Sequence, residues 1–277
     1  MTAAVVLFVL ALPAVAAAIP FQLAYTLPHP APAVGDSFGA AVALAGGRLA
    51  VGAPRHDVTG ASDAGAVYLH DVASGGLVTV LLAPTPAVDA RLGTAVAVDN
   101  LVAAGAPHEN TGEPHAGAVH VFDLNGGYQR SIPNPAPGFD DVFGGAVAIS
   151  GGDIVAGARL DGAGLANAGA AWMLGTGGGV QHTLLAPTPT AYADFGQAVA
   201  IGATDVVVGS PADDGAGANA GAAHVFDAAS GAHRWTLVSP PPALGDDFGR
   251  AVAIGGALVA VGAPLDESER VSLAGAV

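Results

Sequence analysis

The sequence predicts an all-β fold, a β-propeller made of four-stranded antiparallel blades. A unit of about 52 residues recurs five times, and each unit holds four short β-prone runs separated by Gly and Pro. Four strands per repeat is typical of a propeller blade. Long helices are disfavoured because the 41 Gly and 20 Pro residues would interrupt them, at about 1 and 3 kcal/mol per residue.

The N-terminus is apolar from Ala3 to Phe21, with small residues just before Ile19. We expect a secretory signal peptide over residues 1–18 and a propeller over residues 19–277. An uncleaved membrane anchor is the alternative, since this stretch is just long enough to span a bilayer. The chain has no cysteine, which excludes disulfides and thiolate sites.

The first run of each unit follows a Phe-Gly or Leu-Gly pair and alternates Ala with Val, Leu or Ile. The five pairs begin at Phe38, Leu92, Phe143, Phe195 and Phe248. The second run ends in Gly-Ala-Pro or a close variant, at Gly52, Gly105, Gly157, Gly209 and Gly262. The third run opens with Ala-Gly-Ala, and the fourth ends near a proline. Small side chains in these runs suit strands that pack closely between blades.

A fifth copy of the fourth run, Ala24–Leu27, precedes the first unit, whereas the last unit, Phe248–Val277, lacks a fourth run. We therefore expect Ala24–Leu27 to complete the last blade and close a ring of five blades. The alternative is that the chain is part of a larger ring of six or seven blades, because the third run stops early at Val277.

The paired Phe-Gly and Gly-Ala-Pro motifs resemble FG-GAP repeats, as in the N-terminal propeller of integrin α subunits. Leu92, Arg159 and Ser210 depart from the motif. The resemblance covers residues 21–277 and implies an extracellular propeller that acts in adhesion or ligand binding and often holds calcium in its loops.

The calcium-binding copies of that family carry a loop close to Asp-x-Asp-x-Asp-Gly, and no loop here has this pattern. The nearest loops give five candidate ligands: Asp57, Asp63, Asp213, Asp214 and Asn219. Calcium prefers six to eight oxygen ligands, so backbone and water would have to complete each site. The competing interpretation is a turn, in which Asp and Asn bond their own backbone.

A second acidic set lies just before each Phe-Gly or Leu-Gly pair, at Asp36, Asp89, Asp141, Asp194, Asp246 and Asp247. Because it recurs in every unit, we expect it to cap the turn before the first strand rather than to bind a ligand.

No convincing active site is present, and we expect no enzyme activity. His120 and His224 recur at one strand position, which favours a strand-surface role over catalysis. His108, Glu109 and His115 share one loop, but their spacing matches no known metal pattern. Gly35–Gly39 matches a Gly-x-Ser-x-Gly elbow by coincidence, because a strand and not a helix is expected after it.

The charge is strongly acidic, with 23 Asp and Glu against eight Arg and a net charge of −15. This excludes nucleic-acid and anionic-membrane partners, which need a positive surface. We expect a secreted or cell-surface propeller whose loops at 55–63, 107–115, 159–167, 211–219 and 265–273 bind a protein or glycan, with no membrane insertion of the mature chain. The alternatives are an accessory module of a secreted hydrolase and a structural envelope or matrix protein.

Overall fold

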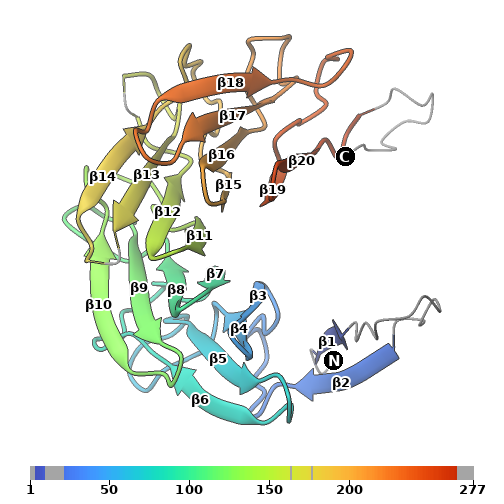
Figure 1. Ribbon diagram of the computed structural model, residues 1–277. Helices are drawn as coiled ribbons and strands as arrows, with labels where there is room; N and C mark the ends of the chain where they lie inside the picture. Colours follow the sequence, from blue (N-terminus) through green and yellow to red (C-terminus); the bar gives the residue numbers. More distant parts are fainter. Residues whose placement is uncertain (1–3, 10–21, 163, 176, 267–277) are drawn as a thin grey trace.

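A computed structural model describes residues 4–9, 22–162, 164–175 and 177–266. The four-strand unit is present as predicted, and the described residues contain no helix. Four complete antiparallel sheets follow one another along an arc (Figure 1). We call them blades 1 to 4, and the two-stranded sheet after them blade 5.

Each blade runs from an innermost first strand to an outermost fourth strand, in sequence order. Blade 1 comprises β3 (Val42–Ala45), β4 (Arg48–Ala53), β5 (Ala66–Asp71) and β6 (Leu77–Leu81). Blade 2 comprises β7 (Ala95–Val98), β8 (Leu101–Ala106), β9 (Ala118–Asp123) and β10 (Tyr128–Pro133). Blade 3 comprises β11 (Ala146–Ser150), β12 (Asp153–Ala158), β13 (Ala170–Gly175) and β14 (Val180–Leu184).

Blade 4 comprises β15 (Ala198–Ile201), β16 (Asp205–Ser210), β17 (Ala222–Asp227) and β18 (His233–Leu237). Blade 5 is described for its first two strands, β19 (Ala251–Gly255) and β20 (Leu258–Gly262). Its expected third run lies outside the described residues. At the N-terminus, β1 (Ala4–Val9) pairs with β2 (Gln22–Pro28).

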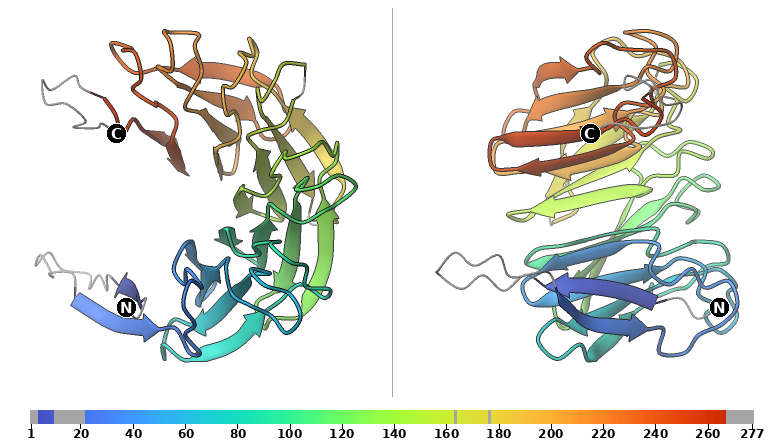
Figure 2. Two further views of the ribbon diagram at one scale, coloured as in Figure 1. Left: turned by 180° about the vertical axis from the view of Figure 1, so that it is seen from behind. Right: turned by 90° about the vertical axis from the view of Figure 1, so that its right-hand side faces the viewer.

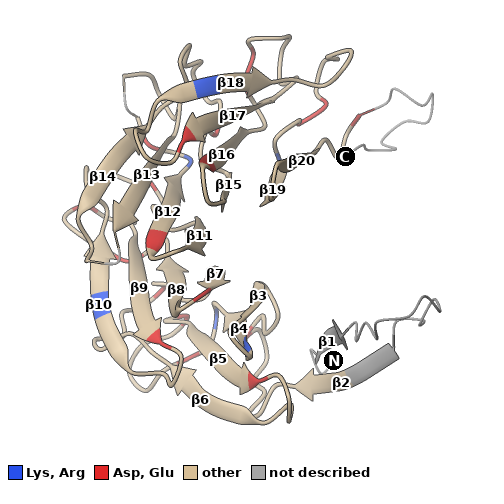
Figure 3. Ribbon diagram, viewed as in Figure 1, with Lys and Arg blue, Asp and Glu red and all other residues tan. Residues whose placement is uncertain are grey.

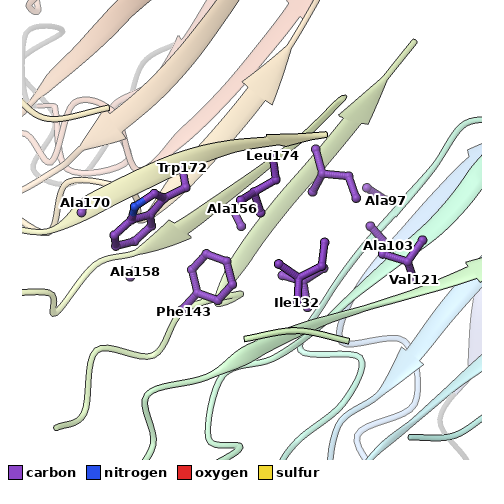
Figure 4. Close-up of a cluster of buried hydrophobic side chains, with 12 residues drawn as sticks. Ala97, Ala103, Val121, Ile132, Phe143, Ala156, Ala158, Ala170, Trp172 and Leu174 are labelled. Atoms are coloured by element: carbon purple, nitrogen blue, oxygen red, sulfur yellow. The ribbon is translucent and has the colours of Figure 1, made fainter. Parts of the chain in front are cut away.

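The hydrophobic core lies between blades rather than inside any one of them. Figure 4 shows the cluster between blades 2 and 3, where Phe143 and Trp172 of blade 3 pack against Val121 and Ile132 of blade 2. The Phe143 and Trp172 rings meet edge-on with 5.5 Å between centroids. Phe143 is fully buried, and burying a side chain of this size contributes about 1.5–3 kcal/mol. The second and third strands are buried because a neighbouring blade packs against each of the two faces of their sheet.

The two glycines of the repeat motif form the closest contact between blades. A Cβ atom on Gly105, at the end of β8, would lie 1.8 Å from the carbonyl oxygen of Gly144 in the next blade. The corresponding distances are 2.0 Å at Gly52, Gly157 and Gly209. Within one blade, the Gly93 N–H donates to the Gly105 carbonyl. Only glycine allows this approach of two backbones.

Backbone hydrogen bonds join neighbouring blades as well. In the four motifs from Leu92 to Phe248, the N–H of the Phe or Leu donates to an alanine carbonyl two residues before the preceding blade's third strand, as Phe143 does to Ala116 at 3.0 Å. Parallel bridges accompany these bonds, for example between Gly117 and Phe143. The motif therefore specifies how one blade docks on the next.

The expectation that Ala24–Leu27 closes the ring is wrong. These residues do occupy the position of a fourth strand, since Leu27 packs with Leu49 and Val51 of blade 1. However, β2 pairs with β1 and lies on the far side of the opening from β20, so the described blades form an open arc (Figures 1 and 2). The edge of β2 that the last blade was expected to use is taken by β1.

Candidate functional site

The loops that precede the first strands and those that join the second and third strands meet at one end of the blades. This loop end holds a cavity of about 210 Å³ lined from blades 2, 3 and 4, with Thr94, His108, Arg159 and Gln197 among its polar residues. Arg159 stands where all four other repeats carry proline, at Pro54, Pro107, Pro211 and Pro264. Its guanidinium lies 3.5 Å from the Asp194 carboxylate. Burial raises the pKa of Asp194, and the charge of Arg159 opposes that shift.

The candidate calcium ligands of the first loop serve the turn. The Asp57 carboxylate accepts the N–H of Asp63 at 2.9 Å, and Asp63 has a left-handed backbone with φ of 50°. Asp57 is exposed.

The loop of blade 4 repeats this arrangement. The Asp214 carboxylate accepts the N–H of Asn219 at 2.8 Å, and Asn219 is left-handed with φ of 50°. The buried Asp213 accepts the N–H of Gly215. Burial raises the pKa of Asp213, and the hydrogen bond from Gly215 opposes that shift. None of these residues belongs to a cluster of three or more metal-binding side chains among the described residues.

The acidic set before the repeat motif divides into two groups. Asp36, Asp141 and Asp246 each accept a backbone N–H three residues earlier, from Ala33, Gly138 and Ala243. These three cap the turn, as expected. Asp89 and Asp194 are offset by one residue and instead contact cationic or imidazole side chains, Arg91 and His108 in one case and Arg159 in the other. Asp247 also faces a cation, since its Oδ2 lies 3.9 Å from Arg250 Nη1. The capping role is therefore wrong for Asp89, Asp194 and Asp247.

The histidines on the third strands are buried, so the expected strand-surface role is wrong. His120 and His224 are each only 2% exposed, because the third strand lies between two blades. The His120 ring contacts Glu109 at 2.6 Å between Nε2 and Oε2. His224 Nε2 lies 4.0 Å from Asp213. In both blades the partner carboxylate comes from the same position of the loop between the second and third strands.

One further cluster was missed as a set in the sequence. Asp89, His108 and His115 come together at the loop end of blade 2, although Asp89 is distant from the two histidines in sequence. The loop pattern indicated His108 and His115 but placed Glu109 with them. Glu109 instead binds His120. The irregular position of Asp89 relative to Leu92 was the available signal.

Gly35–Gly39 leads into β3 and not into a helix, so it is no nucleophile elbow. No helix in the described part of the chain has the length and apolar character to cross a bilayer.

The comparisons with known proteins agree with the repeat geometry. No curated protein matches the chain in a sequence search. A family profile described as FG-GAP repeat matches residues 32–70, 179–226 and 236–277. The units between these ranges have the same strand order and the same glycine contact between blades. Three stretches of the chain therefore match FG-GAP repeats, and the described units form blade-like antiparallel sheets.

Proposed function

We propose that this chain is an extracellular, non-catalytic scaffold that binds a protein or glycan through the loop end of its blades. FG-GAP repeats are commonly extracellular, and the repeated docking between blades supplies a rigid frame for loops that vary. The observation that carries the proposal is the loop-end cavity, because its polar residues differ from those of the other repeats.

The residues around this cavity suit recognition of a hydroxyl-rich or carboxylate-bearing ligand. Arg159 offers a planar set of donors, Gln197 an amide and Thr94 a hydroxyl. Acidic side chains lie at strand ends and in loops around the arc (Figure 3). The partly exposed Arg159, although it lies 3.5 Å from Asp194, places a cationic side chain at this cavity.

Arg159→Pro restores the residue of the other repeats and tests the proposal. We expect binding on a glycan array or a secreted-protein array to fall about tenfold or more, because a hydrogen bond to a charged group contributes about 1.5–3 kcal/mol. The matched control is Arg234→Gln, since Arg234 lies on β18 at the opposite end of blade 4 and should leave binding unchanged. No binding to either array, or unchanged binding by Arg159→Pro, would contradict the proposal.

Calcium support is part of this proposal for the loop 211–219, where Asp213 and Asp214 are adjacent. Asp214→Asn keeps the oxygen that accepts the Asn219 N–H, as Asn110 does for His115 in blade 2, and removes only the charge. Calcium should raise the melting temperature of the parent chain but not of this variant. An equal response of both chains, or none in the parent, argues against a calcium site in this loop.

A further inference from the structure

Three side chains converge at the loop end of blade 2. Asp89 comes from the loop before β7, and His108 and His115 come from the loop between β8 and β9. Each offers one ligand atom, and these atoms all lie within 4.8 Å of one another. His108 Nδ1 lies 3.1 Å from Asp89 Oδ2. The two imidazole rings are stacked, with 4.7 Å between centroids and 25° between planes.

The two histidines stand at repeat positions that other residues occupy in the other blades, so the fold does not require histidine there. His108 occupies the position of Arg55, Leu160 and Ala212, and His115 that of Asp63, Asn167 and Asn219. The backbone at the second position is left-handed in all four blades, with φ between 49° and 52°. Asp and Asn satisfy that conformation in three blades. In a repeat protein a residue with a structural role recurs in every repeat. Two histidines that occur in one blade only, at positions that lie close together, therefore indicate a role local to that blade.

The geometry suits a cation of the zinc type. Zinc binds His nitrogen and Asp oxygen at about 2.0–2.2 Å, so two of its ligands in a tetrahedron lie about 3.3 Å apart. The 3.1 Å between His108 Nδ1 and Asp89 Oδ2 is close to that spacing. The three side chains are 21% to 39% exposed, which leaves the fourth position open to solvent.

Neighbouring groups hold these ligands in place. Asp140 Oδ1 lies 2.7 Å from His115 Nδ1, so the ring directs Nε2 away from that carboxylate. A carboxylate on the second nitrogen is the usual companion of a metal-binding histidine. Arg91 Nε donates to Asp89 Oδ1 at 2.8 Å and leaves Oδ2 facing His108. The negative charge of Asp140 offsets the positive charge of Arg91 near the cluster.

A second cluster, His29, Asp36 and His56 in blade 1, also falls within 4.8 Å, but its chemistry is structural. His29 Nδ1 accepts the N–H of Ala31, so the neutral ring carries its proton on Nε2, which faces Asp36 at 3.4 Å. In blade 3, Asn134 makes the same two contacts, accepting from Ala136 and donating to Asp141. His29 therefore makes the same contacts as Asn134, and its neutral ring has no lone pair on Nε2 for a metal.

We propose that Asp89, His108 and His115 bind one zinc-type divalent cation, with Asp140 orienting His115 and water in the open position. This inference does not rest on the proposed ligand-binding function, because metal binding is measured without any ligand.

The test is isothermal titration of zinc chloride into the full chain after chelator treatment and dialysis. We expect one zinc per chain. His108→Leu and His115→Asn introduce the residues that blade 3 carries, Leu160 and Asn167. Each should weaken zinc binding more than about 100-fold, whereas Asp140→Asn, which alters only an orienting residue, should weaken it about 10- to 100-fold. Unchanged melting temperatures check that the variants fold.

His29→Asn is the matched control, because it restores the asparagine of blade 3 and should bind zinc as the parent chain does. Cobalt as a probe gives a second readout, since a tetrahedral site that includes His108 and His115 should produce visible absorption that both variants lose. The proposal is overturned if the parent chain binds no zinc at one equivalent. It is also overturned if His29→Asn abolishes binding while His108→Leu and His115→Asn retain it.

Discussion

Glycine at two positions of each repeat determines how closely one blade approaches the next. At Gly157 a Cβ atom would lie 2.0 Å from the Gly196 oxygen and 2.8 Å from its carbonyl carbon. Both contacts are with backbone, which cannot move aside as a side chain can. Gly157 does not need a positive φ, so the requirement for glycine at this position is the contact and not the conformation.

Gly157→Ala is therefore expected to destabilise the chain by about 1–3 kcal/mol through overpacking between blades 3 and 4. Denaturant unfolding measures this loss as a lower midpoint. Ala158→Gly in the same strand is a comparison that removes volume without adding a clash. A Gly157→Ala midpoint equal to that of the parent would show that the blades do not meet in this way.

Burial of His224 makes the stability depend on pH. Burial lowers the pKa of His224 to about 4 from its ordinary value of 6.5, and nearby His233 adds to the shift. The unfolded chain therefore binds a proton on this residue at a higher pH than the folded chain does. The free energy of unfolding that depends on neutral His224 is therefore fully present above about pH 6.5. It is lost as the pH falls toward 4, by at most about 3 kcal/mol.

His224→Gln removes that titration and should lose less stability than the parent chain between pH 7 and pH 4.5. Urea unfolding at the two pH values measures the difference, and His182→Gln at a partly exposed position serves as the control. If the parent chain and His224→Gln lose equal stability, the buried histidine is not neutral in the folded chain.

At the level of single residues, the sequence predicted roles that recur and missed roles that differ between blades. The capping by Asp36, Asp141 and Asp246 follows from their common position before the motif. The burial of His120 did not follow, because the alternation of a strand does not reveal that both of its faces are covered. The pairing of His120 with Glu109 requires the fold of a loop that has no regular pattern.

At the level of strands, β2 shows how the repeat extends beyond the complete blades. Its pairing of Val5 with Leu27 and Leu7 with Tyr25, followed by a bulge, matches the pairing of Val67 with Leu81 and Leu69 with Thr79. The sequence pattern of Ala24–Leu27 correctly predicted a strand of the fourth-strand type, which lies beside blade 1. It could not identify the partner strand, because the edge of a strand accepts any neighbour that supplies backbone hydrogen bonds.

No blade follows blade 5 among the described residues, and its motif glycine lacks the backbone contact found in blades 1 to 4. A Cβ atom on Gly262 would meet only Ala251, at an ordinary 3.6 Å. Gly262→Ala should therefore change stability by less than about 0.5 kcal/mol, as for an unconstrained surface position. Thermal unfolding of Gly262→Ala beside Gly157→Ala measures this. A loss as large as that of Gly157→Ala would mean that blade 5 docks on another blade.

For the whole molecule, the sequence correctly predicted the class of fold and the order of strands but not the closure of the ring. Strand number and order follow from periodicity, which is local. Closure depends on the small rotation between successive blades. That rotation is set by packing between blades, such as Phe143 and Trp172 of blade 3 against Val121 and Ile132 of blade 2. The result is an arc whose first strands form one apolar inner face, from Leu44 to Ile254.

The central claim is that the blades dock in series through the glycine contact and leave an opening between β2 and β20. The chain has no cysteine, so spin labels at Thr26→Cys and Ala260→Cys report the distance across the opening without interference. In a closed ring, β20 and β2 would be the second and fourth strands of one blade and would lie about 10 Å apart. Asp153 on β12 and Gln181 on β14, the second and fourth strands of blade 3, are the control pair. We expect a much longer distance for Thr26 and Ala260 than for the control, and a distribution equal to that of the control would contradict the open arc.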